Sequence, residues 1–147
     1  MNAERTDEIL NAYVRAKGGT EWEELVTEAV AALLPDTDEW LVVKTDKGPS
    51  ILALEGEALY RLLTIQLEDR AAMSAERFAL GDGRARASVV ETKSLAYGSW
   101  LRRRTWSFAL EGDRHIEWTT EPLREGDQLS REERIARAIA RITGWPL

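Results

Sequence analysis

The chain has 147 residues, of which 44% are hydrophobic and 31% charged, and its formal net charge is −6. This length and composition fit one folded domain with a buried core and exclude a wholly disordered chain. The absence of cysteine excludes disulfides, thiolate nucleophiles and sulfur-ligated metals. No apolar run approaches the roughly 18–20 residues of a membrane-spanning helix, and the acidic N-terminus has no apolar signal region, so we expect a cytoplasmic protein.

Charge is distributed unevenly along the sequence. Residues 1–39 contain ten acids and three bases, a net of −7, whereas residues 84–110 contain six bases and one acid, a net of +5. Such asymmetry is either paired within the fold or able to steer an oppositely charged partner. The acidic balance of the whole chain argues against a general binder of nucleic-acid phosphates.

Residues 1–36 carry the pattern of a helical hairpin. Ile9 and Tyr13 recur at helical spacing in the first half. Thr20 and Glu23 then have the spacing of a capping box, which predicts the start of a second helix. One face of that second helix is expected to be apolar, comprising Trp22, Leu25, Val26, Ala29, Val30 and Leu33.

Between residues 37 and 121 the pattern changes to antiparallel strands and tight turns. We expect strands at 40–45 and 51–54, joined by a turn at 46–49. Residues 59–67 fit two interpretations, since a helix would spread their apolar side chains nearly all round. We favour a strand, which would place on one face Leu59, Leu63, Ile65 and Leu67.

Two hairpins are predicted in the later part of this region. The first pairs residues 78–80 with 84–92 around the turn Gly81-Asp82-Gly83, and residues 68–75 before it are expected to be a connection. The second hairpin joins residues 101–110 to 115–120. Its expected register places Leu110 opposite Ile116, Phe108 opposite Trp118 and Trp106 opposite Thr120, which collects the large apolar side chains on one face.

Residues 129–144 predict a closing amphipathic helix. Ser130 and Glu133 form a second capping box at its start. Ile135, Ile139 and Ile142 lie on one side, and another side carries a stripe of three arginines, namely Arg134, Arg137 and Arg141. The predicted fold class is therefore α+β in a single domain, with an N-terminal helical hairpin, an antiparallel barrel-like sheet of about six to seven strands, and this C-terminal helix.

Catalytic chemistry finds little support in the residue types. The only histidine, His115, is expected on the outer face of its hairpin opposite Glu111, as a surface residue paired with a carboxylate. No ligand spacing for a metal occurs, and neither glycine-rich phosphate-binding pattern is present. We therefore expect no catalytic residue, no metal site and no cofactor.

A cluster of arginines between two tryptophans is the main candidate binding site. Strand alternation places Trp100, Arg102, Arg104 and Trp106 on one face and Arg103 on the other. A structural role would pair these arginines with acids of the N-terminal hairpin and stack them on the indole rings. A functional role would use their guanidinium groups to bind a carboxylate or phosphate.

The strand order from Trp40 onward, with turns at "GDG" and "EGDR" and the closing segment "REERIARAIARITGWPL", resembles bacterial pleckstrin-homology-like domains. The resemblance covers about 110 residues and rests on element order. It implies two roughly orthogonal sheets and a final helix that plugs one end. It also implies a module that binds peptides, partner proteins or acidic lipid headgroups, for which Arg102, Arg103 and Arg104 would be the candidates.

Our leading hypothesis is a non-catalytic module that binds another protein through the Trp100–Trp106 cluster, with an anionic ligand as the other possible occupant. An alternative is an acidic inhibitor, of the immunity-protein type, that neutralises a basic toxin or enzyme. Its binding face would be Glu21, Glu24 and Glu28. A third alternative is a small-ligand-binding barrel or an enzyme with an apolar pocket.

Overall fold

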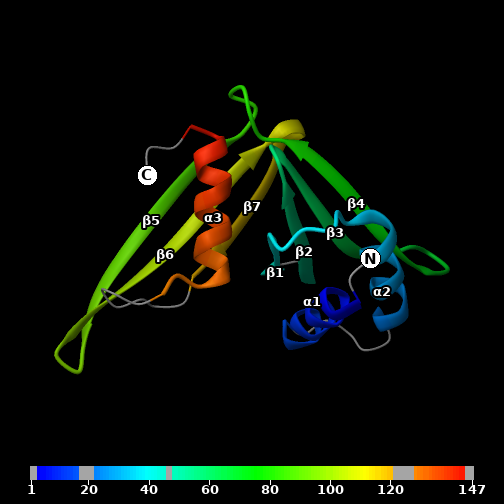
Figure 1. The fold of residues 1–147 in the computed structure, drawn as a ribbon, viewed down its shortest axis with the longest axis horizontal. Helices are drawn as coiled ribbons and strands as arrows, with labels where there is room; N and C mark the ends of the chain where they lie inside the picture. Colours follow the sequence, from blue (N-terminus) through cyan, green and yellow to red (C-terminus); the bar gives the residue numbers. More distant parts are fainter. Residues whose placement is uncertain (1–2, 17–21, 46–47, 121–127, 145–147) are drawn as a thin grey trace. The chain divides into compact units, whose positions relative to one another are not determined.

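The computed structural model describes residues 3–16, 22–45, 48–120 and 128–144. In these residues it contains three α-helices and seven strands, which form an antiparallel sheet of four strands and another of three (Figure 1). The predicted α+β class, with its N-terminal helix pair, antiparallel strands and C-terminal helix, is confirmed. The chain divides into two compact units, Met1–Phe78 and Ala79–Leu147.

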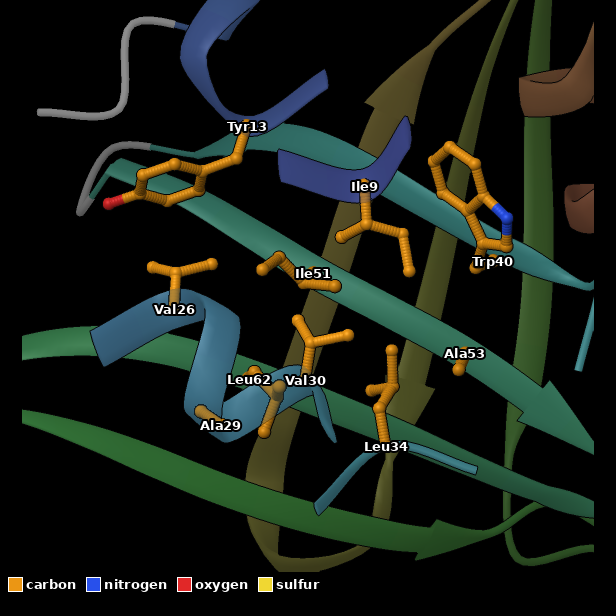
Figure 2. Close-up of a cluster of buried hydrophobic side chains, with 10 residues drawn as sticks. All are labelled: Ile9, Tyr13, Val26, Ala29, Val30, Leu34, Trp40, Ile51, Ala53 and Leu62. Carbon is orange, nitrogen blue, oxygen red and sulfur yellow. The ribbon is translucent and has the colours of Figure 1, made fainter. Parts of the chain in front are cut away.

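The first unit is a helix pair on one face of the four-stranded sheet. Helix α1 spans Ala3–Arg15 and contacts the first two strands, and helix α2 spans Glu23–Leu33 and contacts the third. Side chains from both helices and the sheet converge between the two layers (Figure 2). This buried cluster consists of Ile9, Tyr13, Val26, Ala29, Val30, Leu34, Trp40, Ile51, Ala53 and Leu62.

The strands of this sheet follow one another in chain order. They are β1 (Trp40–Thr45), β2 (Gly48–Glu55), β3 (Ala58–Gln66) and β4 (Ala71–Ala79). The strand interpretation of residues 59–67 is confirmed by β3. Two boundaries were wrong, because Gly48 and Pro49 pair with β1 instead of forming a turn, and the expected connection 68–75 contains the start of β4.

The register explains which side chains face the helices. Trp40 lies opposite Ala53, and Ile51 lies opposite Leu62, so these alternate positions share the helix-facing side. The predicted apolar face of β3 begins at Leu59, which is buried on the opposite side of the sheet. Both faces of β3 therefore carry buried apolar side chains, which is why its periodicity was ambiguous between strand and helix.

The two ends of α2 differ from the sequence prediction. The helix begins at Glu23 after Trp22, whereas Thr20 of the expected capping box lies outside the described residues. At the other end Leu33 is 47% exposed, and Leu34 occupies the core at 4% exposure. Leu34 has extended backbone angles. That change from helical to extended geometry turns its side chain inward in place of Leu33.

The second unit is a three-stranded sheet covered by one helix (Figure 1). Its elements are β5 (Arg86–Ala96), β6 (Ser99–Leu110), β7 (Arg114–Thr119) and helix α3 (Arg131–Ile142). The rings of Trp106 and Phe108 lie 6.2 Å apart, and those of Phe108 and Trp118 lie 5.1 Å apart, on the face of the sheet that α3 covers.

The predicted register of the β6–β7 hairpin was wrong by two residues. Trp106 lies opposite Trp118, and Phe108 lies opposite Ile116. The difference arises because residues Glu111–Asp113 alone make the turn, with Gly112 at φ 71° and Asp113 at φ 59°. A shift of two leaves every side chain on its predicted face, so the hydrophobic pattern could not distinguish the two registers.

The predicted hairpin around Gly81–Gly83 was also wrong. The local turn is present, since Asp82 and Gly83 have positive φ and the Arg84 N–H donates to the Gly81 carbonyl at 3.2 Å. However, β4 belongs to the four-stranded sheet and β5 to the three-stranded sheet. A tight turn thus joins two sheets here, because each strand pairs with a different partner.

Candidate functional site

The arginine–tryptophan cluster follows the predicted alternation along β6 and occupies two different environments. The strand register places Trp100, Arg102, Arg104 and Trp106 on one face, with Arg103 on the other. Trp106 is 1% exposed, whereas Trp100 is 62% exposed. The cluster therefore divides into an inner part beneath α3 and an outer part at the end of the β5–β6 hairpin.

The inner part is built around a buried carboxylate, Glu133 in the first turn of α3. Glu133 is 0% exposed. Its Oε2 accepts a hydrogen bond from Trp106 Nε1 at 2.8 Å, while its Oε1 accepts from Arg137 Nε at 3.2 Å and from an amino group of Arg104. Both oxygens are thus satisfied and the charge is compensated, as burial of a carboxylate requires.

This network fixes where α3 lies on the sheet. Ser130 caps the helix, since its side chain accepts from the Glu133 N–H at 3.2 Å. The Glu133 side chain points to the sheet. In a complete capping box it would instead accept a hydrogen bond from the Ser130 backbone N–H. Trp118 Nε1 adds a bond to the Glu132 carbonyl at 3.1 Å. Arg104 and Trp106 therefore hold α3 in place, which is a structural role.

The ion pairs of the arginines also differ from the expectation. Arg104 Nε lies 3.5 Å and Arg102 Nε 3.9 Å from Oε1 of Glu91 on β5. The acids that compensate these arginines thus include Glu91 and Glu133 of the same unit. The structural interpretation of the sequence expected acids of the N-terminal hairpin instead. Among the described residues, cation–π contacts occur at Arg61 over Phe78 and Arg77 over Tyr60, both within the first unit.

The outer part is the end of the β5–β6 hairpin, which the sequence pattern did not predict. A two-residue turn of Tyr97 and Gly98 joins strands of eleven and twelve residues. Leu95 lies opposite Trp100, and these side chains are 63% and 62% exposed. Tyr97 is fully exposed at φ 51°. We name Leu95, Tyr97 and Trp100 the hairpin tip.

A sequence signal for this turn existed but was weak. Two-residue hairpin turns with positive φ at both positions favour Asn-Gly or Asp-Gly. Here Gly98 (φ 76°) follows a tyrosine, a residue that rarely adopts positive φ. Gly98, which lies between two alternating segments, indicated a turn, whereas the preceding tyrosine is not typical of one.

Among the described residues on the outer face of the three-stranded sheet, Ser107, His115 and Glu117 are not arranged as a catalytic triad. Ser107 Oγ donates to Glu117 Oε2 at 2.7 Å, and His115 Nε2 lies 3.9 Å from the same oxygen. The carboxylate thus lies between the serine and the histidine, whereas nucleophile activation needs the histidine in the middle. The partner of His115 is Glu117 instead of the predicted Glu111, which pairs with Arg84 at 3.6 Å.

The alternative acidic face is partly within the described residues. Glu24 and Glu28 are exposed on α2, one helical turn apart. Glu21 lies outside the described residues. We name these two exposed carboxylates of the first unit the acidic strip.

Among the described residues no group of three or more histidine, aspartate or glutamate side chains has the geometry to hold a metal ion. Within the same residues, no helix is long and apolar enough to cross a membrane. No protein-family model, curated protein or solved structure matches this chain.

Proposed function

We propose that this protein is a non-catalytic module that binds another protein, and that the hairpin tip makes the contact. The observation that carries the proposal is three large apolar side chains exposed together at one end of a hairpin, in Leu95, Tyr97 and Trp100. Tyrosine and tryptophan are the residues most enriched where protein interfaces gain their binding energy. The non-catalytic part of the proposal is supported by Ser107 on the outer sheet face, which donates to Glu117 instead of to His115.

The inner part of the arginine–tryptophan cluster has a structural role, which leaves the outer part as the candidate for binding. Arg104 and Trp106 both donate hydrogen bonds to Glu133, so they hold α3 against the inner part of the hairpin. We also propose that the fold is of the pleckstrin-homology-like type, since four and three antiparallel strands are followed by a helix. Such a fold would favour a binding module.

Position-specific cross-linking in the native host tests the proposal. We would replace Tyr97 with a photoreactive phenylalanine derivative, which keeps an aromatic ring at the tip. The matched control carries the same derivative at Ala109, an exposed position on the outer face of β6. We expect one dominant protein adduct from position 97, absent from position 109 and lost when Trp100→Ser is added. Equal adducts from both positions, or none from position 97, would contradict the proposal.

A second candidate function is supported by the acidic strip. Glu24 and Glu28 would suit an inhibitor that captures a basic toxin or enzyme, because complementary charge accelerates association. The same cross-linking derivative placed at Thr27 on α2, with Thr27 half-buried beside the strip, distinguishes the two. An adduct from position 27 with a basic protein, and none from position 97, would favour the inhibitor.

A further inference from the structure

We infer that the partner of the hairpin tip presents an apolar surface bordered by carboxylates; this inference rests on the proposed function and names the chemistry of its partner. The features that indicate this partner all lie at the end of the hairpin, residues 92–103. In Figure 1 this end lies beyond the first turn of α3, so α3 does not cover it.

The first observation is the charge of this end. Residues 92–103 contain Lys93, Arg102 and Arg103 and no acid, in a chain of net charge −6. Lys93 lies directly opposite Arg102 across the two strands. Like charges in directly opposed positions destabilise a sheet. Among the described residues Arg102 pairs with Glu91, which lies 3.9 Å from Arg102 and 3.5 Å from Arg104, so the charge of this acid is divided between two arginines.

The second observation is the backbone of Tyr97. A bulky residue at positive φ is disfavoured by contact between its Cβ and the backbone, and asparagine or glycine would make the same turn without strain. Burial does not compensate, because the side chain is fully exposed. A strained residue that the fold does not require points to a role in contact with another molecule.

Both unfavourable features lie at the same place and would be relieved by the same partner. Carboxylates next to Lys93 and Arg102 would neutralise the opposed positive charges, while an apolar surface would bury the aromatic rings of Tyr97 and Trp100. The charge of the rest of the chain separates this partner from an anionic membrane. A bilayer would also repel the exposed acids elsewhere in the chain, whereas a protein surface of this size contacts the hairpin tip alone.

Random linear peptides displayed on phage provide a defined probe. The library is panned on the full-length protein and counter-selected on the Tyr97→Asn/Trp100→Ser variant, which removes the aromatic tip while keeping a turn-compatible residue. Both proteins are first shown to melt cooperatively. We expect the surviving peptides to be enriched both in aspartate or glutamate and in large apolar residues.

Charge variants then separate the basic border from general attraction. Individual peptides should lose about tenfold in affinity on the Lys93→Gln/Arg102→Gln/Arg103→Gln variant, because three border ion pairs of modest strength are removed together. The matched control, Arg134→Gln/Arg141→Gln, removes exposed positive charge from α3 and should leave affinity unchanged. The binding should also weaken as salt is raised.

Several outcomes would overturn the inference. Tip-dependent peptides without acidic enrichment would remove the carboxylate border while leaving the proposed function intact, and cross-linking from position 97 would still report a partner. No tip-dependent peptide at all would also overturn it. Tip-dependent sedimentation with phosphatidylserine vesicles would assign the surface to a membrane. Concentration-dependent association of the pure protein, lost in the tip variant, would assign it to a second copy of the chain.

Discussion

The two units stabilise their helices in different ways. In the first unit α1 and α2 lie on the sheet through an apolar cluster around Ile51, and a buried arginine, Arg5, donates to the carbonyl of Pro35, the residue after Leu34 of that cluster. In the second unit α3 also has a buried apolar side, which includes Ile135 and Ile139, and to it adds a carboxylate buried among Arg104, Arg137 and Trp106. Apolar packing tolerates small changes in position, whereas hydrogen bonds require one alignment. We infer that Glu133 both attaches α3 to the sheet and determines the position of α3 on the sheet.

The largest effect is expected from removing Glu133. Glu133→Ala leaves Arg104 without its buried counter-charge and the Trp106 N–H without an acceptor, so we expect a loss of about 3–5 kcal/mol in the free energy of unfolding. Urea denaturation followed by tryptophan fluorescence measures this loss. Glu132→Ala is the control, because that neighbour contributes through its backbone carbonyl. Similar stability of the two variants would show that the network does not hold the helix.

In the first unit the corresponding test is the removal of apolar volume. Ile51 is fully buried, so Ile51→Ala should destabilise the protein by about 2–5 kcal/mol through lost burial and a cavity. Ile51→Val should cost only about 0.5–1.5 kcal/mol, since it removes one methylene. A graded loss in urea denaturation would confirm apolar packing. An equal loss for both variants would indicate a specific contact and weaken the contrast between the units.

Arg5 tests whether buried charge also matters in the first unit. Its guanidinium donates to the carbonyls of Pro35 and Thr37, and its Nε lies 3.4 Å from Asp36 Oδ1. Arg5→Ala should cost about 1.5–3 kcal/mol, the usual contribution of hydrogen bonds from a charged group. Asp36→Ala should cost less than about 1 kcal/mol because that carboxylate is mostly exposed. The reverse order in thermal or urea unfolding would assign the stabilisation to the ion pair.

The cap of α3 is expected to contribute less. Ser130→Ala removes the acceptor for the Glu133 N–H and should cost about 1 kcal/mol, while Ser130→Asp should be close to neutral because aspartate also caps helices. Hydrogen exchange at the first turn of α3 would locate the effect. Unchanged exchange in Ser130→Ala would mean that the Glu133 side chain alone fixes this end of the helix.

The smallest effect should have the opposite sign. Tyr97→Asn places a residue that tolerates positive φ in the hairpin turn, so the melting temperature should rise slightly. Tyr97→Phe is the control, since it keeps the strain and should leave the melting temperature unchanged. A lower melting temperature for Tyr97→Asn would show that the tyrosine stabilises the fold, and the argument for an external contact would then lose its support.

How far the sequence predicted the candidate site depends on the residue. Alternation correctly placed Trp100, Arg102 and Trp106 on one face of a strand, because period two follows from strand geometry. It did not separate the buried Trp106 from the exposed Trp100, because exposure depends on where α3 lies. Glu133 was recognised only as a capping residue, and Tyr97 was not recognised as part of a turn.

By itself the sequence determined part of the local structure of this protein. It determined the α+β class, the faces of the hairpin around Glu111–Asp113 and the Ser130 cap, because periodicity, turn residues and caps act over a few neighbouring positions. Only the tertiary structure decided that β4 and β5 belong to different sheets and that Glu133 faces Arg104. Those choices depend on competition between partners distant in sequence, which no local pattern encodes.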